Sequence, residues 1–367
     1  MEKTVLPGGL ATSGLVFLYL PLCDGNGHQV SFGIAEELLH LSMKYGPGRV
    51  PEGWRDARNA QEEERYHALF SPASFVLALD EVLEKADVHM WFDSLVVGPV
   101  MDGPRVTGVE VEGKGGRMVV KCSCVVDATG DADVAYRAGT LCADGGNMLS
   151  VWALQASLEK AAKAVKESDG AMLMDLVSLG DEWSRLKEAS AKHERLGTDV
   201  ESVTAFVLDG RRLLREHYRR LHGGMGGEGR HAVYPLVLPT MAQFRMTRRI
   251  AGRTTMRPGE GNKHVADSVG MCPDWRLPGP VWEVPYGALV PEGVEGLLVA
   301  GRCMAAEGDA WDVMRVIPAA AVTGQAAGLA AALAARSGIT PGDIGVSELQ
   351  AGLRRRGISL HRDELAS

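Results

Sequence analysis

A short apolar run followed by an alanine-rich segment, near the end of the chain, constrains the fold more than any other feature. Leu297 to Ala300 is apolar and is closed by Gly301, a pattern typical of a buried parallel strand. From Pro318 onward the pattern predicts a helix, because proline suits a first helical position. Unpaired N–H groups and the positive dipole end at its N-terminus suit an electron-rich ligand. The same pattern also fits one βα unit of any α/β domain.

Three sequence blocks combine short apolar runs with glycines. They are Val125-Val126-Asp127-Ala128-Thr129-Gly130-Asp131, Trp282 to Pro291, and Leu298 to Cys303 followed by Arg315 to Pro318 and Gly324 to Gly328. In this order the blocks resemble the FAD-dependent oxidoreductases of the glutathione-reductase-like superfamily. The resemblance covers about 1–145 and 235–360 and is poor between these ranges.

The resemblance implies an α/β fold with a Rossmann-like FAD-binding domain and an inserted, mostly helical or mixed substrate domain. It divides the chain into 1–147, with a small antiparallel layer at about 94–124, then 148–279 and 280–367. Strands at 125–129 and 297–300 are expected to be parallel neighbours in one sheet. The implied cofactor is FAD, and the implied activity is transfer of a hydride from a small organic substrate to the flavin.

The resemblance also indicates which residues bind FAD. They are Glu2, Gly8, Gly9, Thr12, Thr129, Gly130, Asp131, Gly301, Arg302, Arg315, Val316, Ile317 and Pro318. Glu2 corresponds to the acid that binds the adenosine ribose hydroxyls. Arg315 would lie near the reduced flavin ring, or would pair with Asp309 or Asp312. Asp131 is equally well suited to cap a helix N-terminus.

In the family, a strand, a G-x-G-x-x-G turn and a helix precede the acid that Glu2 resembles. None of these precedes Glu2, so the first strands of the sheet are expected to be missing, unless the start of the sequence is in error. Residues 1–367 alone are then expected to bind FAD weakly or not at all. Gly224 to Gly229 matches G-x-G-x-x-G, but it follows a helical stretch rather than a strand. We interpret it as a glycine linker.

The candidate catalytic residues are Glu307, then Asp309, and Arg245. Carboxylates near a flavin face can accept a proton, whereas family members often carry a histidine at this place. Arg245, with Arg248 and Arg249, could bind a substrate carboxylate through paired hydrogen bonds. The alternative for all of them is a structural ion pair.

The remaining pattern predicts the intervening elements. Helices are expected at 32–45, from Ser71, and at 154–166, 172–193 and 200–222, a strand at 88–92, and hairpin strands within 94–111 and 117–124. The arginine-rich face of the 200–222 helix is interpreted as a solvated surface rather than an anion site. The run from Val316 to Ala335 is long enough to span a bilayer, but it is alanine and glycine, which favours a core helix.

Composition bounds the partners. A net charge of −8 argues against nucleic acid or an anionic membrane as the main partner. Six cysteines without a CxxC pair favour a reducing, cytoplasmic location. None of the ten histidines has a spacing that suggests a metal site, so no metal is expected. The expected partner is a small-molecule substrate, with a homo-oligomer or a second chain that supplies the missing strands as further options. The rival hypothesis is a flavin-free remnant or partner subunit.

Overall fold

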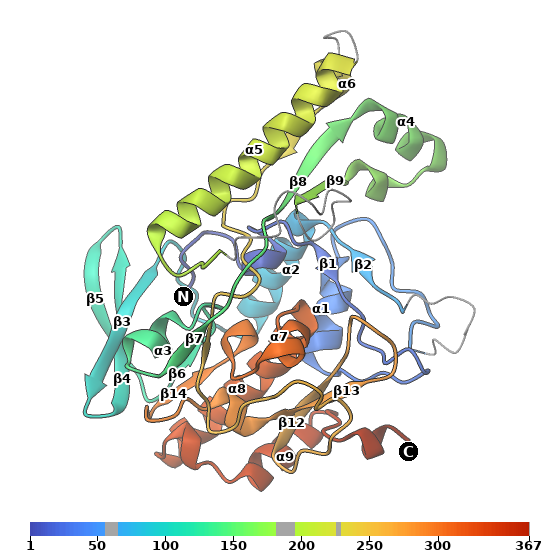
Figure 1. The fold of residues 1–367 in the computed structure, drawn as a ribbon. Coiled ribbons are helices and arrows are strands. Elements are labelled where there is room, and N and C mark those ends of the chain that lie inside the picture. Colours follow the sequence, from blue (N-terminus) through green and yellow to red (C-terminus); the bar gives the residue numbers. More distant parts are fainter. Residues whose placement is uncertain (56–64, 181–194, 225–228, 367) are drawn as a thin grey trace.

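The computed structural model describes residues 1–55, 65–180, 195–224 and 229–366 (Figure 1). Its helices are α1 (Ile34–Ser42), α2 (Pro72–Lys85), α3 (Asp133–Arg137), α4 (Leu158–Glu167), α5 (Val200–Gly224), α6 (Gly229–Ala232), α7 (Gly308–Met314), α8 (Ile317–Ser337) and α9 (Val346–Arg354). Its strands are β1 (Leu18–Tyr19), β2 (Ala68–Leu69), β3 (Leu95–Asp102), β4 (Arg105–Gly113), β5 (Gly116–Lys121), β6 (Val125–Asp127), β7 (Cys142–Asp144), β8 (Ser150–Ser157), β9 (Asp175–Gly180), β10 (Val233–Val237), β11 (Arg248–Ile250), β12 (Ser268–Pro273), β13 (Val281–Pro285) and β14 (Leu297–Val299).

Strands β6 and β14 form a parallel pair within the main hydrophobic core. β6 pairs with β14 in the register Leu297 with Val125. A 3-10 turn (Gly301–Cys303) and α7 lie between β14 and α8 along the chain. The pairing of β6 with β14 confirms the prediction of parallel neighbours at 125–129 and 297–300. Within the described ranges, β14 is the only strand that pairs with β6.

The segment predicted as a strand at 88–92 forms no strand in the structure, which corrects that prediction. The backbone of Glu2 donates to the carbonyl of Trp91 over 2.8 Å, and Asp93 donates to the carbonyl of Thr4 over 3.0 Å. The first residues of the chain therefore lie along this segment. The few hydrogen bonds between them do not build a regular ladder.

Helix α8 is a core helix, as its alanine-rich sequence predicts. Ala319, Val322, Ala326 and Ala330 are buried, and the helix contacts β12 closely. A side-chain carbon added at Gly270 of β12 would lie 2.6 Å from Cγ1 of Val322. By length and composition α8 also qualifies as a membrane span. The small residues instead let it pack against the sheet.

The small antiparallel layer is confirmed as the sheet β3-β4-β5, with turns at Gly103 and at Lys114 and Gly115. The helix predicted at 32–45 is α1. The helix predicted from Ser71 is α2, where the Ser71 side chain accepts a hydrogen bond from the Ser74 backbone. Local capping and periodicity were sufficient signals for these elements.

A second group of elements, which we call the outer layer, consists of the sheet β10-β8-β9 covered by α5. It projects from the body at the top of Figure 1. Val151, Ala153, Val177, Leu214 and Tyr218 form its own small core. The helix predicted at 200–222 is confirmed as α5, and the helix predicted at 154–166 is confirmed for most of its length as α4, which begins at Leu158. Residues 154–157, at the start of the second of these predictions, belong to β8 instead. The helix predicted at 172–193 is wrong, because 175–180 form β9, and 181–194 lie outside the described residues.

The helix predicted from 154 begins four residues too early, since β8 runs to Ser157. The part of β8 before residue 154 has partners on both faces. Val151 and Ala153 pack towards α5, whereas Trp152 contacts Phe17 of the body, with 6.3 Å between the ring centres. A strand that is covered on both faces shows no apolar–polar alternation. Its sequence then resembles that of a buried helix.

Two short antiparallel strand pairs lie at the boundaries of the three expected parts of the chain. β7 pairs with β11, so the strand that leads towards the outer layer lies beside the strand that returns from it. β12 pairs with β13 across residue 279, the expected end of the substrate domain. The three-part division remains a prediction. Of the expected glycine linker from Gly224 to Gly229, the first residue ends α5 and the last begins α6, whereas 225–228 lie outside the described residues.

Candidate functional site

The end of β6 carries a buried carboxylate that organises the turn after it. Oδ1 of Asp127 accepts hydrogen bonds from the backbone and hydroxyl of Thr129, at 3.0 and 2.7 Å. Oδ2 accepts from the backbone N–H groups of Val134 and Ala135, each at 2.9 Å. Asp127 therefore caps α3 from outside the helix and fixes the loop between them. Asp131, the capping candidate from the sequence, does not cap α3.

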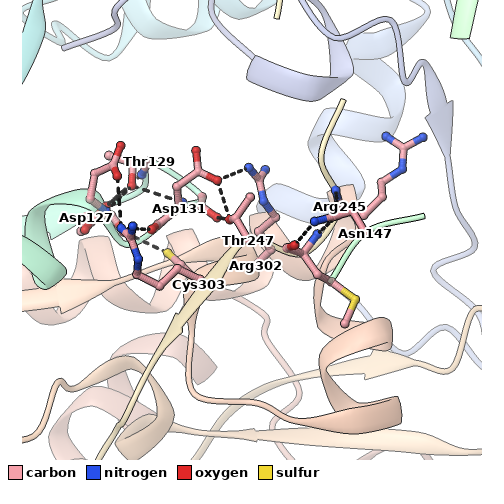
Figure 2. Close-up of polar contacts among 12 residues, drawn as sticks. Asp127, Thr129, Asp131, Asn147, Arg245, Thr247, Arg302 and Cys303 are labelled. Carbon is pink, nitrogen blue, oxygen red and sulfur yellow. Dashed lines mark hydrogen bonds and ion pairs between the residues drawn. The ribbon is translucent and has the colours of Figure 1, made fainter. Parts of the chain in front are cut away.

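Three segments far apart in the sequence meet at Asp131. Its Oδ1 accepts hydrogen bonds from Nη2 of Arg302 over 2.7 Å and from Oγ1 of Thr247 over 2.6 Å, as Figure 2 shows. We call these three residues the Asp131 cluster. The side chains of Asp131 and Arg302 are 23% and 12% exposed, so water screens their ion pair little. The structure thus brings the predicted residues of the first and last blocks together.

Gly130 lets the Arg302 side chain lie directly against the backbone. Its φ of +77° is in the left-handed region, and a side-chain carbon there would lie 2.8 Å from Nη1 of Arg302. Any other residue would therefore cost backbone strain and displace the guanidinium group. The close approach of Arg302 and the positive φ angle together explain why position 130 is a glycine.

The N-terminus of α8 lies next to Gly301. The Gly301 backbone donates to Oγ1 of Thr323, on the second turn of α8, over 2.9 Å. No described side chain caps the N-terminus of α8, which begins after Val316 with Pro318 in its first turn. An uncapped helix start in this position can bind an electron-rich group.

The candidate catalytic carboxylates are both near arginines. Oε2 of Glu307 lies 3.5 Å from Nη2 of Arg249, and Oδ2 of Asp309 lies 3.6 Å from Nη2 of Arg276. The Arg249 guanidinium lies 5.7 Å from the ring centre of Trp311. Trp311 in turn donates a hydrogen bond to the carbonyl of Arg302, so Glu307 is joined to the Asp131 cluster.

The predicted arginines have partners in their own chain. Nε of Arg315 donates to Oδ1 of Asp312 over 2.6 Å, which is one of the two pairs expected from the sequence. The Arg245 guanidinium lies 5.5 Å from the ring centre of Trp152. Asn147 accepts a hydrogen bond from the Arg245 backbone, which fixes the start of this strand-like segment (Figure 2). Whether Arg245 also contacts a substrate remains a prediction.

The candidate residues near the start of the chain lie in a separate loop. The Glu2 carboxylate accepts from the backbone and hydroxyl of Thr4 at 2.9 and 3.0 Å, and the Thr12 hydroxyl donates to the carbonyl of Pro7 over 2.6 Å. Gly8 and Gly9 begin a short 3-10 turn with positive φ angles. The loop is fastened to the segment before Arg245, because Thr240 donates to the carbonyl of Ser13.

A family model described as "FAD dependent oxidoreductase" matches residues 1–150 and 150–353. The chain belongs to this family. FAD is therefore its cofactor. The two matched ranges together include the Asp131 cluster, Gly301 and the whole of α8.

The Asp131 cluster and α8 of this FAD-dependent oxidoreductase fit such a cofactor. Nε of Arg302 is buried and has no hydrogen-bond partner among the described residues. The face of Gly301 is open, because a side-chain carbon built there would meet only Cβ of Ala320, at 3.9 Å. An unpaired donor, an open glycine and an uncapped helix start together can receive a large polar ligand.

Two solved structures are similar to parts of the chain. The anhydrotetracycline hydroxylase OxyS from Streptomyces rimosus is 18% identical to this chain, with a TM-score of 0.23. The match covers 28% of this chain and 21% of the hydroxylase chain. A geranylgeranyl bacteriochlorophyll reductase-like protein from Thermoplasma acidophilum is 11% identical to this chain, with a TM-score of 0.40. The match covers 81% of this chain and 62% of the reductase-like chain. The chain thus spans less than two thirds of either protein. No curated protein matches it.

Two groups near the site have perturbed acidity. Burial raises the pKa of the Cys303 thiol strongly, and the nearby charge of Asp127 adds to this effect. Burial also raises the pKa of Asp133, with the charge of Asp131 as a further cause. Cys303 is therefore a protonated core thiol rather than a nucleophile.

Proposed function

We propose that the chain is an oxidoreductase that transfers a hydride from a small organic substrate to FAD, bound in a Rossmann-like arrangement beside the Asp131 cluster. The observation that carries this proposal is the uncapped start of α8 next to the open Gly301, within a chain of the FAD-dependent oxidoreductase family. When bound, FAD supplies the hydride acceptor.

The free thiols of all six cysteines, which lie in the described ranges, support a cytoplasmic location.

The protein's own part is to hold the cofactor and to stabilise charge. The N–H groups and the dipole of α8 favour negative charge at its N-terminus. Arg315 adds a positive charge there, and its bond to Asp312 fixes the guanidinium rather than leaving it to move. The Asp131–Arg302 pair holds the loops of β6 and β14 together, so that the glycines on both sides keep their positions.

We assign proton transfer to Glu307. Its side chain is 43% exposed, so it can reach a ligand, and Arg249 restricts its orientation. Asp309 is the weaker candidate, because Arg276, its partner, is already held by Asp274 over 2.7 Å. Arg245 is retained as a residue that binds a substrate carboxylate.

An anaerobic reduction experiment tests this function. FAD-loaded protein is mixed with alcohols, amines and hydroxy acids, and the flavin absorbance is followed. We expect one class to bleach the flavin, and Glu307→Gln to slow the bleaching about 100-fold, within the range of general-base effects. Glu292→Gln, at an exposed position, is the matched control and should leave the rate unchanged.

Two outcomes would contradict the proposal. Bleaching by a reduced nicotinamide nucleotide but by none of these substrates would mean that the flavin is reduced by that nucleotide instead. Failure to retain any FAD, which is expected if the first strands are missing, would favour the flavin-free partner subunit. The single strand neighbour of β6 in the described ranges supports that alternative.

A further inference from the structure

Two histidines and a glutamate from three distant segments meet beside β13. His264 precedes β12, Glu283 lies in β13, and His361 follows α9 near the C-terminus. One ligand atom of each lies within 4.8 Å of the others. Because His264 and His361 are so far apart in the sequence, no spacing pattern reveals the group. The prediction that the chain has no metal site rested on spacing alone.

Glu283 is a buried carboxylate that the backbone orients towards the two imidazoles. Its Oε1 accepts from the N–H of Arg362 over 3.0 Å, and its Oε2 accepts from the N–H of Val265 over 2.8 Å. Burial of a carboxylate requires such partners. Both donors are main-chain groups next to the two histidines, so the carboxylate is fixed relative to both rings.

His361 places a ring nitrogen directly beside the Glu283 carboxylate. Its Nδ1 lies 2.9 Å from Oε2 of Glu283, and the residue is buried. A metal ion can take the place of the proton between these two atoms, because a ring nitrogen binds a metal only when it is deprotonated. Nδ1 of His361 and the Glu283 carboxylate can therefore both be ligands of one ion.

His264 supplies the second imidazole. Its ring centre lies 4.5 Å from that of His361 at an angle of 31°, and its Nδ1 lies 3.8 Å from Oε2 of Glu283. Two nitrogen ligands of a tetrahedral zinc ion are about 3.4 Å apart, given bonds of about 2.1 Å. The His264 side chain is 66% exposed, so a small rotation can close the remaining gap.

We propose that His264, Glu283 and His361 bind one divalent transition-metal ion of the Zn²⁺ type. Imidazole and carboxylate ligands suit this class, and an exposed His264 leaves room for water as a further ligand. The ion fastens the C-terminal segment to β13 and to the loop before β12. Ser268 already donates to the carbonyl of Leu360 over 2.7 Å at the same place.

Titration of the metal-free full chain with Zn²⁺ in a calorimeter tests the proposal. We expect one equivalent to bind, and His264→Ala to weaken binding at least about tenfold. His67→Ala is the matched control, because His67 is exposed and lies outside the cluster. Since His361→Ala can also loosen the C-terminal segment, the exposed His264 carries the test.

A Co²⁺ spectrum distinguishes this site from the six free cysteines. Binding by two imidazoles and a carboxylate gives visible bands without sulfur-to-metal charge transfer, and His264→Ala removes them. Zn²⁺ binding that His264→Ala leaves unchanged, a spectrum with sulfur charge transfer, or no binding at one equivalent would each overturn the proposal. The last result would leave Glu283 and His361 as a structural hydrogen-bonded pair.

Discussion

The Asp131 cluster and the outer layer are held together by different forces. In the cluster, one ion pair and a hydroxyl join segments from both ends of the chain, and Gly130 permits their close contact. In the outer layer, five apolar side chains between α5 and its sheet form a separate core. Polar contacts of fixed geometry suit a ligand site, whereas the outer layer depends on burial. Substitutions in the two regions should therefore separate cofactor binding from stability.

The largest effect is expected at Arg302. Arg302→Ala leaves Asp131 without its charged partner, and loss of one member of a buried pair costs about 3 to 5 kcal/mol. The affinity of this variant for FAD should fall as well. Urea unfolding and flavin retention measure the two effects. Arg117→Ala is the control: it breaks an exposed pair with Glu112, at 2.9 Å, and should cost at most about 1 kcal/mol. Equal losses of stability and of FAD affinity in the two variants would contradict a special role for Arg302.

A smaller effect is expected in the outer layer. Leu214→Ala removes a buried side chain from its core and should cost about 2 to 3 kcal/mol, at the lower end for such cavities because the core is small. FAD affinity should not change. Leu208→Ala, at an exposed position of the same helix, should stay within about 0.5 kcal/mol. A loss of FAD in Leu214→Ala would show that the two regions are coupled.

The smallest effect depends on pH and concerns Asp274. Burial opposes its ionisation, but hydrogen bonds from Arg276 and Trp282 outweigh burial and hold its pKa below the ordinary value. The charged form therefore stabilises the fold above the unfolded pKa of about 3.9, and this stability is lost as the pH falls through the lower folded pKa.

Asp274→Asn should thus cost about 1.5 kcal/mol at pH 7, and the difference from wild type should shrink below about pH 4. Urea unfolding at the two pH values measures this. A difference that is constant or grows with acid would show that another group accounts for the acid sensitivity.

The sequence was informative where backbone chemistry is local. Leu297 to Ala300 and the helix from Pro318 were predicted because an apolar run closed by glycine has few alternatives, and the structure confirms both. The pairing of Arg315 with Asp312 was one of two options three to six residues away, and is the one observed.

Prediction from the sequence failed where contacts between distant residues determine the local structure. Asp127 caps α3 through groups seven and eight residues away, and only the fold shows that its carboxylate points there. The start of α4 was placed four residues early, because the last residues of β8, 154–157, show no apolar–polar alternation. The His264–Glu283–His361 group forms only when the C-terminal segment reaches β13.

Hydrogen exchange with and without FAD tests the central claim most directly, because it locates the cofactor in the whole chain. At FAD concentrations about ten times the dissociation constant, amides at the site should exchange about tenfold more slowly. We predict this protection in peptides that cover 125–134, 297–303 and the first turn of α8, and no change in α5. Protection confined to α5 and its sheet, or none at saturating FAD, would contradict the account.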